Sequence, residues 1–435
     1  MKAIMYGLGR IGLPIALTCA KSGIKVTGID VNRRLINTLR EKKAPFHEEG
    51  LIEALEENLD KNFFPKHPEE NIGEDYAEAD YVIIAVGTGF ARFPDEPNLS
   101  TLYSIIGQII AHGIRNKTVI LRVTLPIGTT EMIIKLIERK TGLVEGEDFF
   151  FAFVPERIME GKAMSEEASL PKVIGSTNDE CYHRVEKFFL KIGGNLTRVT
   201  NPRTAEFIKL IDNSWRNTKF SFSNELAYLA ESNNIDVTEA INTANEGYER
   251  NMIPRPGPVS GYCLGKDPYI LELAFKEISE RRGFNSLWYY GRRANDWLYE
   301  KIMDSITGKK VLILGLSFKE DIDDYRYSHS VNIIKGCIER NHDISVYDPF
   351  LNVNYYTKIP DDIYIHVKPV ERPEDIDPTN YDSIVISVRH EEFITEEFKN
   401  KIGIALQNGV KIIDLWNIYR EFLHLKGYIS LGSSH

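Results

Sequence analysis

Cys263 is the residue best placed for nucleophilic chemistry. It lies in the segment from Pro256 to Asp267, where glycines and prolines exclude a helix and leave the thiol on a loop. Lys266, three residues later, favours the thiolate, which is the form of cysteine that attacks carbon. Unpaired cysteines more often behave as small buried hydrophobes. The other three match that alternative because each lies in a helix-like stretch: Cys19, Cys181 and Cys337.

A glycine turn near the start of the chain is typical of dinucleotide binding. It follows a predicted strand at residues 2–6, opens a predicted helix at 13–22, and is followed by Asp30 at the end of the next predicted strand, 25–29. In this motif Gly7 permits the tight turn, Gly9 lets the backbone approach the pyrophosphate, and Gly12 permits close helix packing. We expect the cofactor to contact Gly7, Gly9, Arg10, Ile11, Gly12 and Asp30.

The acid at the strand end also predicts which cofactor is used. Asp30 can accept hydrogen bonds from ribose hydroxyls and repels a 2'-phosphate, so NAD is favoured over NADP. Arg33 and Arg34 nearby weaken this exclusion, although both also suit the solvated start of a helix.

The remaining strand-like runs must position these groups. Runs at 81–86, 118–123 and 149–154 alternate with helical patterns, and the pattern restarts at 311–314, 344–347 and 383–388. Between them, Asn201 reads as an N-cap with Pro202 at the first helical position. We predict an α/β chain of two Rossmann-like doubly wound domains, 1–200 and 308–435, joined by a mostly helical domain, 201–307.

Polar residues gather where ligands of open α/β sheets bind, at the carboxyl ends of strands. Gly87-Thr88, Thr124 and Glu156 occupy three such ends. Thr124 and Glu156 also have ordinary alternatives, as a turn hydroxyl and as a partner of Arg157. Their shared location makes them candidates for the site.

The predicted helix after Asn201 carries two more candidates. Lys209 and Asn213, one turn apart, present a cation and an amide that can stabilise one oxyanion. Phe207, Leu210 and Ile211 lie on another face, and the alternative is that the polar face is simply solvated.

Composition limits the classes of partner and the compartment. A net charge of -10 argues against binding nucleic acid or coating an anionic membrane, and no run reaches membrane-spanning length. The apolar N-terminal run flows into the glycine turn and is read as a strand, not a signal peptide. Four scattered cysteines without CxxC spacing predict no disulfide framework and no metal site, which suits a cytoplasmic location.

In order along nearly the whole chain, the motifs resemble those of the UDP-glucose/GDP-mannose dehydrogenase family. The matching segments are Gly7 to Pro14, Val86 to Thr88, Arg122 to Thr129, Pro155 to Arg157, Thr204 to Leu210 with Asn213 and Asn224-Glu225, Cys263 to Asp267, and Gly315 to Lys319 through Asp323-Asp324 to Arg326.

The resemblance implies an NAD-dependent, four-electron oxidation of a UDP-sugar C6 alcohol to a uronate. Cys263 would form a thiohemiacetal and then a thioester, with Lys209 and Asn213 stabilising oxyanions. Asp323 and Thr124 would position water, and Glu156 would assist hydrolysis as a base. The resemblance also implies a homodimer through the central helices, and a UDP-sugar site that draws on these residues: Glu156, Arg157, Lys209, Asn213, Arg250, Arg255, Gly261, Lys319 and Arg389.

Two departures leave the sugar open. Many members have a glycine-rich PGPGxGG-like loop where this chain has Pro258-Val259-Ser260-Gly261. Pro155-Glu156-Arg157-Ile158 is similar to the branch acting on UDP-N-acetylhexosamines, whereas Cys263 to Asp267 is similar to UDP-glucose enzymes. A two-electron hydroxy-acid dehydrogenase needs neither Cys263 nor a third domain. A non-catalytic NAD-binding protein would be expected to lack the catalytic residue types that this chain retains.

Overall fold

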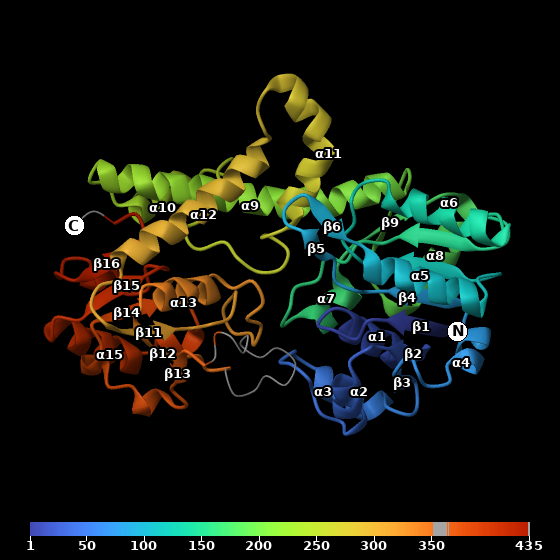
Figure 1. The fold of residues 1–435 in the computed structure, drawn as a ribbon, viewed down its shortest axis with the longest axis horizontal. Helices are drawn as coiled ribbons and strands as arrows, with labels where there is room; N and C mark the ends of the chain where they lie inside the picture. The colour runs from blue at the N-terminus through green and yellow to red at the C-terminus, as the bar shows by residue number, and fades with distance from the viewer. Residues whose placement is uncertain (351–362, 364, 434–435) are drawn as a thin grey trace. The chain divides into compact units, whose positions relative to one another are not determined.

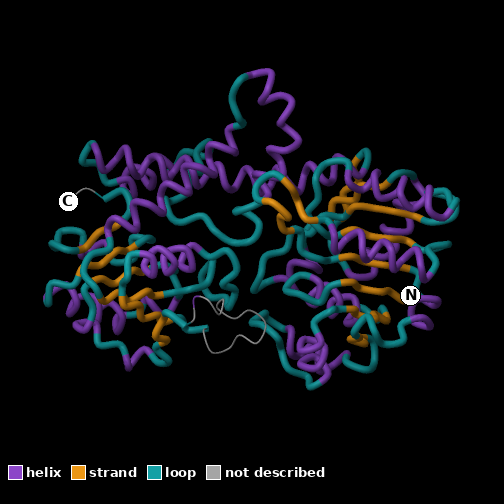
Figure 2. The backbone as a smooth tube through the Cα atoms, in the orientation of Figure 1, coloured by secondary structure: helices purple, strands orange, loops and turns teal. Residues whose placement is uncertain are grey.

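The computed structural model describes residues 1–350, 363 and 365–433. The chain divides into two compact units (Figure 1). The first unit comprises residues 1–212 and 269–274, and the second comprises 213–268 and 275–435. Each unit is built around one sheet, visible as the two groups of strands in Figure 2.

The first unit contains an eight-stranded sheet in the order β10-β9-β8-β7-β4-β1-β2-β3. From β3 at one end of this order as far as β8, neighbouring strands pair in parallel. Strand β9 runs antiparallel to β8. A separate hairpin, β5 and β6, follows β4. The strands are β1 (Lys2–Tyr6), β2 (Lys25–Ile29), β3 (Phe63–Lys66), β4 (Tyr81–Ile84), β5 (Gly89–Arg92), β6 (Glu96–Asn98), β7 (Thr118–Leu121), β8 (Phe150–Phe153), β9 (Lys172–Ser176) and β10 (Leu196–Val199).

Apolar side chains at alternate strand positions pack between this sheet and its helices. Ile4, Val82 and Val119 lie in one cluster with Ile105 of α5 and Ile133 of α6. Strands buried on both faces read as continuous apolar runs, which is why the sequence revealed them. The helices of this unit are α1 (Gly12–Lys21), α2 (Arg33–Arg40), α3 (Leu51–Asn58), α4 (Gly73–Glu78), α5 (Ser100–His112), α6 (Thr129–Thr141), α7 (Ala163–Ser169) and α8 (Asp179–Ile192).

Four helices form the middle of the chain: α9 (Pro202–Ser232), α10 (Val237–Asn245), α11 (Asp267–Arg282) and α12 (Leu287–Ser305). The Asn201 side chain accepts from the Thr204 amide at 2.9 Å, which confirms the predicted N-cap of α9. Residues 246–266, which carry Cys263, form no helix or strand, as the glycines and prolines predicted.

The second unit contains a six-stranded, wholly parallel sheet in the order β13-β12-β11-β14-β15-β16. The fold class predicted from the sequence is confirmed. The strands are β11 (Lys310–Leu314), β12 (Asp343–Tyr347), β13 (Val367–Pro369), β14 (Ser383–Ile386), β15 (Lys411–Asp414) and β16 (Tyr428–Ser430). The described helices are α13 (His329–Glu339) and α15 (Glu396–Gln407), with short 3-10 turns η1 (Pro373–Asp375), η2 (Pro378–Asn380), η3 (Glu391–Ile394) and η4 (Arg420–Phe422).

The polar face of α9 is buried, and part of its apolar side is exposed. The alternative of a solvated polar face is wrong, because Glu206, Lys209, Asn213 and Asn217 are all buried. Phe207 and Ile211, on the apolar side, are exposed. Asn217 accepts from the Asn295 amide of α12 at 3.0 Å, so part of the polar face is used between helices. Across the part of the chain that the structure describes, no helix is both long and apolar enough to cross a bilayer.

Candidate active site

The glycine turn has the geometry that close backbone approach requires. Gly7 has a φ of 91°, and a Cβ there would lie 2.5 Å from the Ala85 carbonyl oxygen. A Cβ at Gly12 would lie 1.9 Å from the Gly7 carbonyl oxygen. Neither position tolerates a side chain, so α1 begins tightly against the turn and points its N-terminus at the carboxyl end of β1.

Asp30 is held so that its carboxylate faces this turn. Its Oδ2 accepts from the Leu8 amide and its Oδ1 from the Asn32 amide, both at 2.8 Å. The residue stays half-exposed, so a carboxylate remains accessible at the position where the motif contacts a ribose. Arg33 opens α2 and pairs with Glu69 at the surface, which agrees with its alternative role as a solvated helix start.

Arg10 is buried although it lies within the turn. Its guanidinium lies over the Phe46 ring, 5.0 Å from the centroid, and its Nε is 3.9 Å from Glu160 Oε2. The predicted cofactor residues Ile11 and Thr88 lie at the start of α1 and just before β5, and Gly87 precedes Thr88. All follow strands β1 and β4, which are neighbours in the sheet.

Glu156 contacts Lys209, not Arg157. Lys209 Nζ donates to the Glu156 backbone oxygen at 2.6 Å and lies 3.4 Å from its Oε2. Arg157 instead pairs with Asp212 at 2.9 Å. The alternative in which Glu156 serves only as a partner of Arg157 is therefore wrong. A buried carboxylate beside an ammonium at a strand end is an arrangement suited to acid–base chemistry.

Glu206 joins α9 to the loop after β7, and sequence reasoning gave it no role of its own. Its carboxylate accepts from the Gly128 amide at 2.5 Å and from the Thr130 amide and hydroxyl at 2.8 and 2.6 Å. Burial raises the pKa of Glu206, against these hydrogen bonds, which lower it. Because Lys209 is one turn further along α9, Glu206 fixes the helix that presents Lys209 to the strand ends. Thr124 lies half-buried in the same loop.

A buried ion pair, also without a role in the sequence analysis, anchors the same strand. Arg122, directly after β7, makes two bonds to the Glu167 carboxylate at 2.7 and 3.0 Å. Lys172 Nζ lies 3.7 Å from Glu167 as well. The family-like run from Arg122 to Thr129 contained this signal, because a charged residue ending an apolar strand needs a partner.

Cys263 is half-exposed, whereas Cys19, Cys181 and Cys337 are buried in helices. Its carbonyl accepts from the Lys266 and Asp267 amides at 3.3 and 3.0 Å, which forms the turn leading into α11. Lys266 Nζ is paired with the Asp267 carboxylate. The spacing in the sequence suggested that Lys266 acts on the thiol. In the structure the lysine is engaged by a carboxylate, so it does not act on the thiol alone.

Asn213 is directed at the same carboxylate. Its amide donates to Asp267 Oδ2 at 2.5 Å, and its Oδ1 accepts from Arg216. Asn213, Asp267 and Lys266 thus form a buried polar group beside the Cys263 turn. Lys209 belongs to the first unit and Asn213 to the second, although the two are one turn apart on α9.

The acidic run after β11 is not an exposed turn. Asp323 and Asp324 are fully buried, and Asp324 accepts from Arg326 at 2.7 Å. By its charge alone, the run from Lys319 to Arg326 is typical of an exposed acidic turn, and the burial of Asp323 and Asp324 shows that this interpretation is wrong. The position of the run after a strand-end glycine was the better guide, because the carboxyl end of a parallel sheet is a binding edge.

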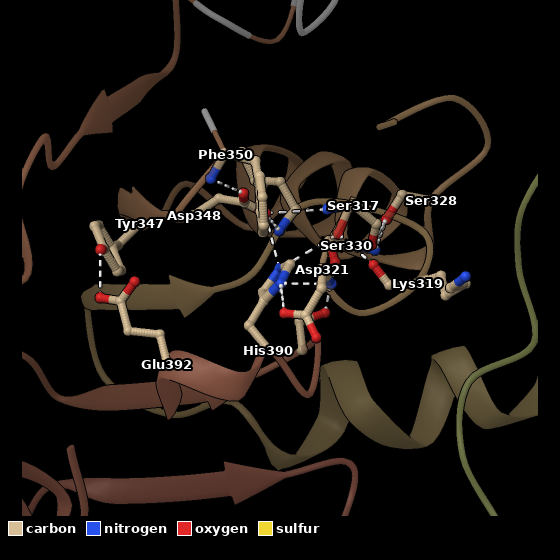
Figure 3. Close-up of polar contacts among 12 residues, drawn as sticks. Ser317, Lys319, Asp321, Ser328, Ser330, Tyr347, Asp348, Phe350, His390 and Glu392 are labelled. Atoms are coloured by element: carbon tan, nitrogen blue, oxygen red, sulfur yellow. Dashed lines mark hydrogen bonds and ion pairs between the residues drawn. The ribbon is translucent and has the colours of Figure 1, made fainter. Parts of the chain in front are cut away.

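His390 organises this edge, and sequence reasoning missed it. Its Nδ1 accepts from the Asp321 amide at 3.0 Å, and its Nε2 lies 3.3 Å from Asp348 Oδ2 (Figure 3). Ser317 donates to the Lys319 backbone oxygen at 2.6 Å, so the turn carrying Lys319 is fixed on both sides. The signal lay beside a residue already singled out, since His390 follows Arg389, which is exposed.

The remaining predicted substrate residues lie near the cysteine loop in the chain. Arg250 and Arg255 are exposed, and Arg250 lies 4.8 Å from the Tyr248 ring centroid. Gly261 is buried with a φ of 89°, and a Cβ there would lie 2.6 Å from the Phe318 ring. Among the described residues no group of histidines, cysteines and carboxylates is arranged to hold a metal ion.

Comparison with known proteins decides the family. The sequence matches the NAD binding domain of the UDP-glucose/GDP-mannose dehydrogenase family over residues 1–192, its central domain over 203–296 and its UDP binding domain over 312–421. The chain belongs to this family. It is an NAD-dependent oxidoreductase that acts on a UDP-sugar.

Its relatives include enzymes for N-acetylated sugars. The chain is 31% identical over 433 residues to UDP-N-acetyl-D-mannosamine dehydrogenase of Pyrococcus horikoshii, covering 97% of this chain and 96% of that protein. It is 27% identical over 408 residues to UDP-N-acetyl-D-glucosamine 6-dehydrogenase of Salmonella typhi, covering 90% and 91%. The solved structure of the UDP-D-ManNAc dehydrogenase of Pyrococcus horikoshii superposes with a TM-score of 0.84 at 29% identity and covers 99% of both chains.

Proposed function

We propose that the enzyme oxidises the C6 alcohol of a UDP-N-acetylhexosamine, of the mannosamine or glucosamine type, to the uronate. One observation carries the covalent part of this proposal: Cys263 is half-exposed on an irregular loop, while the other three cysteines are buried in helices. An aldehyde cannot expel hydride until a nucleophile adds to it, and an accessible thiol can supply that nucleophile for the second oxidation. The proposed reaction consumes two NAD and one water for each sugar.

The residues of the first unit fit NAD. Gly7 and Gly12 are too crowded to carry side chains, so only backbone lies where a pyrophosphate must approach. Asp30 presents a carboxylate for ribose hydroxyls. Gly9, Arg10, Ile11, Gly87, Thr88 and Thr124 complete the proposed cofactor site. When bound, NAD supplies the hydride acceptor for both oxidations.

The proposed catalytic residues each have a role in the second oxidation or in the hydrolysis. Cys263 adds to the aldehyde to give a thiohemiacetal, and loss of hydride from that adduct leaves a thioester. Lys209 and Asn213 stabilise the oxyanions, and Thr124 and Asp323 position the hydrolytic water. Glu156, whose Oε1 is buried without a hydrogen-bond partner in the structure, acts as the base that removes a proton from this water.

The proposed UDP-sugar site uses residues that follow strands of the second sheet and residues near the cysteine loop. Lys319 and Arg389 follow the carboxyl ends of β11 and β14, which supports a role for both in binding the nucleotide. Arg250 and Arg255 contact the diphosphate, in part from the partner subunit, and Gly261 brings backbone close to the sugar. Arg157, beside Glu156, is a further proposed substrate residue.

The choice of sugar rests on Pro155-Glu156-Arg157 and is supported by the names of the relatives. UDP-glucose is the alternative. A panel of UDP- and GDP-sugars assayed for NADH production tests the choice, and the highest kcat/KM should belong to an N-acetylated UDP-sugar. A preference for UDP-glucose would refute the sugar assignment while leaving the chemistry intact.

A dimer through the central helices explains why apolar side chains of α9 are exposed. Trp215, Phe222 and Leu229 are 62%, 52% and 60% exposed. These positions recur on one face of the helix, and such an apolar stripe on an isolated chain marks an interface. Light scattering at assay concentration should give a dimer or larger oligomer, and a fully active monomer would exclude the partner's arginines from the site.

The proposed domain organisation follows the same division of labour. Residues 1–200 bind NAD, 201–307 dimerise and carry the catalytic lysine and cysteine, and 308–435 bind the UDP-sugar. We place the enzyme in the cytoplasm, supplying uronic acid precursors for polysaccharide biosynthesis.

Substitution of Cys263 tests the mechanism. Cys263→Ala should retain part of the alcohol oxidation, because Lys209 and the cofactor site remain, but acid formation should fall by several orders of magnitude. Wild type should yield two NADH for each limiting sugar, and Glu156→Gln should accumulate a thioester on Cys263 that intact mass spectrometry detects. Near-normal uronate formation by Cys263→Ala would exclude the covalent mechanism.

A further inference from the structure

The thiol loop, defined as residues 256–266, is held from two sides within the second unit. On the helical side, Asn224 of α9 accepts from the Gly257 amide at 2.8 Å and donates to its carbonyl at 3.0 Å. Arg292 of α12 donates to the Val259 carbonyl at 3.1 Å. These bonds fix the first half of the loop and leave the three residues before Cys263 to other contacts.

The second side is the carboxyl end of β14, and one carbonyl organises it. The Ser387 oxygen accepts from His329 Nε2 at 2.6 Å and from Trp416 Nε1 at 2.7 Å. Both rings then meet the thiol loop. Trp416 packs so closely on Gly257 that a Cβ there would lie 2.7 Å from the ring. His329 Nδ1 lies 2.9 Å from the hydroxyl of Ser260.

The hydrogen-bond directions at His329 follow from its partners. A carbonyl oxygen can only accept, so Nε2 carries the hydrogen that bonds to Ser387. Burial lowers the pKa of His329 to about 4, and the ring is therefore neutral near pH 7. In a neutral imidazole the other nitrogen is an acceptor, so the Ser260 hydroxyl must donate to Nδ1. The Phe318 carbonyl, 3.4 Å from the same hydroxyl, is the weaker partner.

The next contacts carry this restraint to the thiol. The Gly261 amide donates to the Tyr327 carbonyl at 3.0 Å, and the Tyr262 ring lies 5.4 Å from that of Tyr327. Residues 260–262 are therefore docked on the loop between β11 and α13, which is the loop that contains Asp323.

We propose that Ser260 and His329 are positioning residues that together orient Cys263 for attack on the aldehyde. The inference rests on the proposed function, because orienting Cys263 has no purpose if the thiol does not react. Neither residue touches the substrate carbon in this scheme. Because attack by a positioned nucleophile is sensitive to displacements of about 1 Å, loss of the bond should slow the second oxidation more than it changes substrate binding.

The test measures the two oxidations separately in the full-length enzyme. Single-turnover NADH formation is followed with the UDP-sugar alcohol and, separately, with the corresponding UDP-sugar 6-aldehyde. The variants are Ser260→Ala, His329→Gln and the double variant, with Ser260→Thr as a rescue that keeps the hydroxyl. His329→Gln removes the acceptor at Nδ1 while its amide can still donate to Ser387.

Ser383→Ala is the matched control. Like the Ser260 hydroxyl, its hydroxyl has two partners, but both are backbone groups: it donates to the Thr307 carbonyl at 2.7 Å and accepts from the Thr307 amide at 3.1 Å. Ser383 lies at the start of β14, at the opposite end of the strand from the Ser387 carbonyl. This variant should lower the Tm and leave both oxidation rates within about twofold of wild type, since it removes two hydrogen bonds of ordinary strength far from the thiol loop.

We expect Ser260→Ala and His329→Gln each to slow aldehyde oxidation about 10- to 100-fold, with KM for the UDP-sugar changed less than about threefold. The double variant should be no slower than the slower single variant, because both remove one bond. Ser260→Thr should recover most of the rate. Multiplicative effects in the double variant, equal slowing in Ser383→Ala, or normal aldehyde oxidation in Ser260→Ala would overturn the proposal.

Cys263→Ala, assayed beside these variants, separates the two ideas. If it still forms uronate with two NADH, the covalent mechanism fails whatever Ser260 does. If it fails to form uronate while Ser260→Ala is normal, only the positioning role is overturned.

Discussion

The two sheets begin with nearly the same turn. After β1, Gly7 has a φ of 91° and the Leu8 amide donates to Asp30, the acid that ends β2. After β11, Gly315 has a φ of 89° and the Leu316 amide donates at 2.6 Å to Asp348, the acid that ends β12. Each acid also accepts from the amide two residues after it.

The difference lies in what surrounds each acid. Asp30 is half-exposed, and α1 begins at once at Gly12. Asp348 is 3% exposed, accepts a further amide from Ser317, and has His390 Nε2 at 3.3 Å. The first acid is available to a ribose, whereas the second is used by the protein itself. A shared strand–turn–acid pattern therefore predicts a shared backbone, but it does not predict a shared ligand.

The largest effect should come from Asp348→Ala. It removes a buried carboxylate from three amides and a histidine, which should cost about 3–5 kcal/mol of unfolding free energy. Asp30→Ala should cost about 1 kcal/mol or less, since water can replace a half-exposed acceptor. All four tryptophans lie in the second unit, so urea unfolding followed by tryptophan fluorescence reports on Asp348 directly. If circular dichroism showed the same loss of unfolding free energy for both variants, the contrast between the two acids would not hold.

A second prediction concerns pH and His329. Its pKa is lowered to about 4 in the folded chain from an ordinary 6.5, so the unfolded chain binds the proton first as pH falls. The neutral ring stabilises the fold fully above about pH 6.5, and this contribution is lost towards pH 4, at most about 3 kcal/mol. His329→Gln should show a shallower loss of stability over this window than wild type. If wild type and His329→Gln lost stability in parallel as pH falls, the burial of this ring would be contradicted.

Asp30→Ala should change cofactor use more than stability. Loss of the bonds from ribose hydroxyls to a carboxylate should raise KM for NAD about 10- to 100-fold, or about 1.4–2.7 kcal/mol. Removal of the repulsion towards a 2'-phosphate should also narrow the preference for NAD over NADP. Steady-state rates with both cofactors measure this, and an unchanged ratio would show that another group selects NAD.

The smallest effect should follow Arg33→Ala. Arg33 and Glu69 form a surface pair with side chains 62% and 73% exposed, so stability should change by less than about 0.5 kcal/mol. KM for NAD should stay within about twofold, as the pair lies outside the turn. In an Asp30→Ala background, however, Arg33→Ala should weaken NADP use if this arginine meets the 2'-phosphate. No change in that background would confine Arg33 to the helix start.

The site illustrates why some residues could be predicted and others could not. Gly7, Gly12 and Asp30 were recognisable because their roles depend on backbone shape and on spacing within one strand–turn–helix unit. Glu206, Arg122 and His390 were missed because their partners are 42 to 78 residues away along the chain. No local pattern encodes such a partner.

Helix α9 shows the same limit for an element whose start was predicted well. The sequence alone determined that a helix begins at Pro202, because an N-cap and a proline act within one turn. It also determined the fold class, because parallel strands buried on both faces must be apolar and must alternate with helices. Only the tertiary structure decided that the polar face of α9 is buried, that Glu156 meets Lys209, and that Ser260 meets His329. Burial and hydrogen-bond partners depend on which segments pack together, and that is a property of the folded chain as a whole.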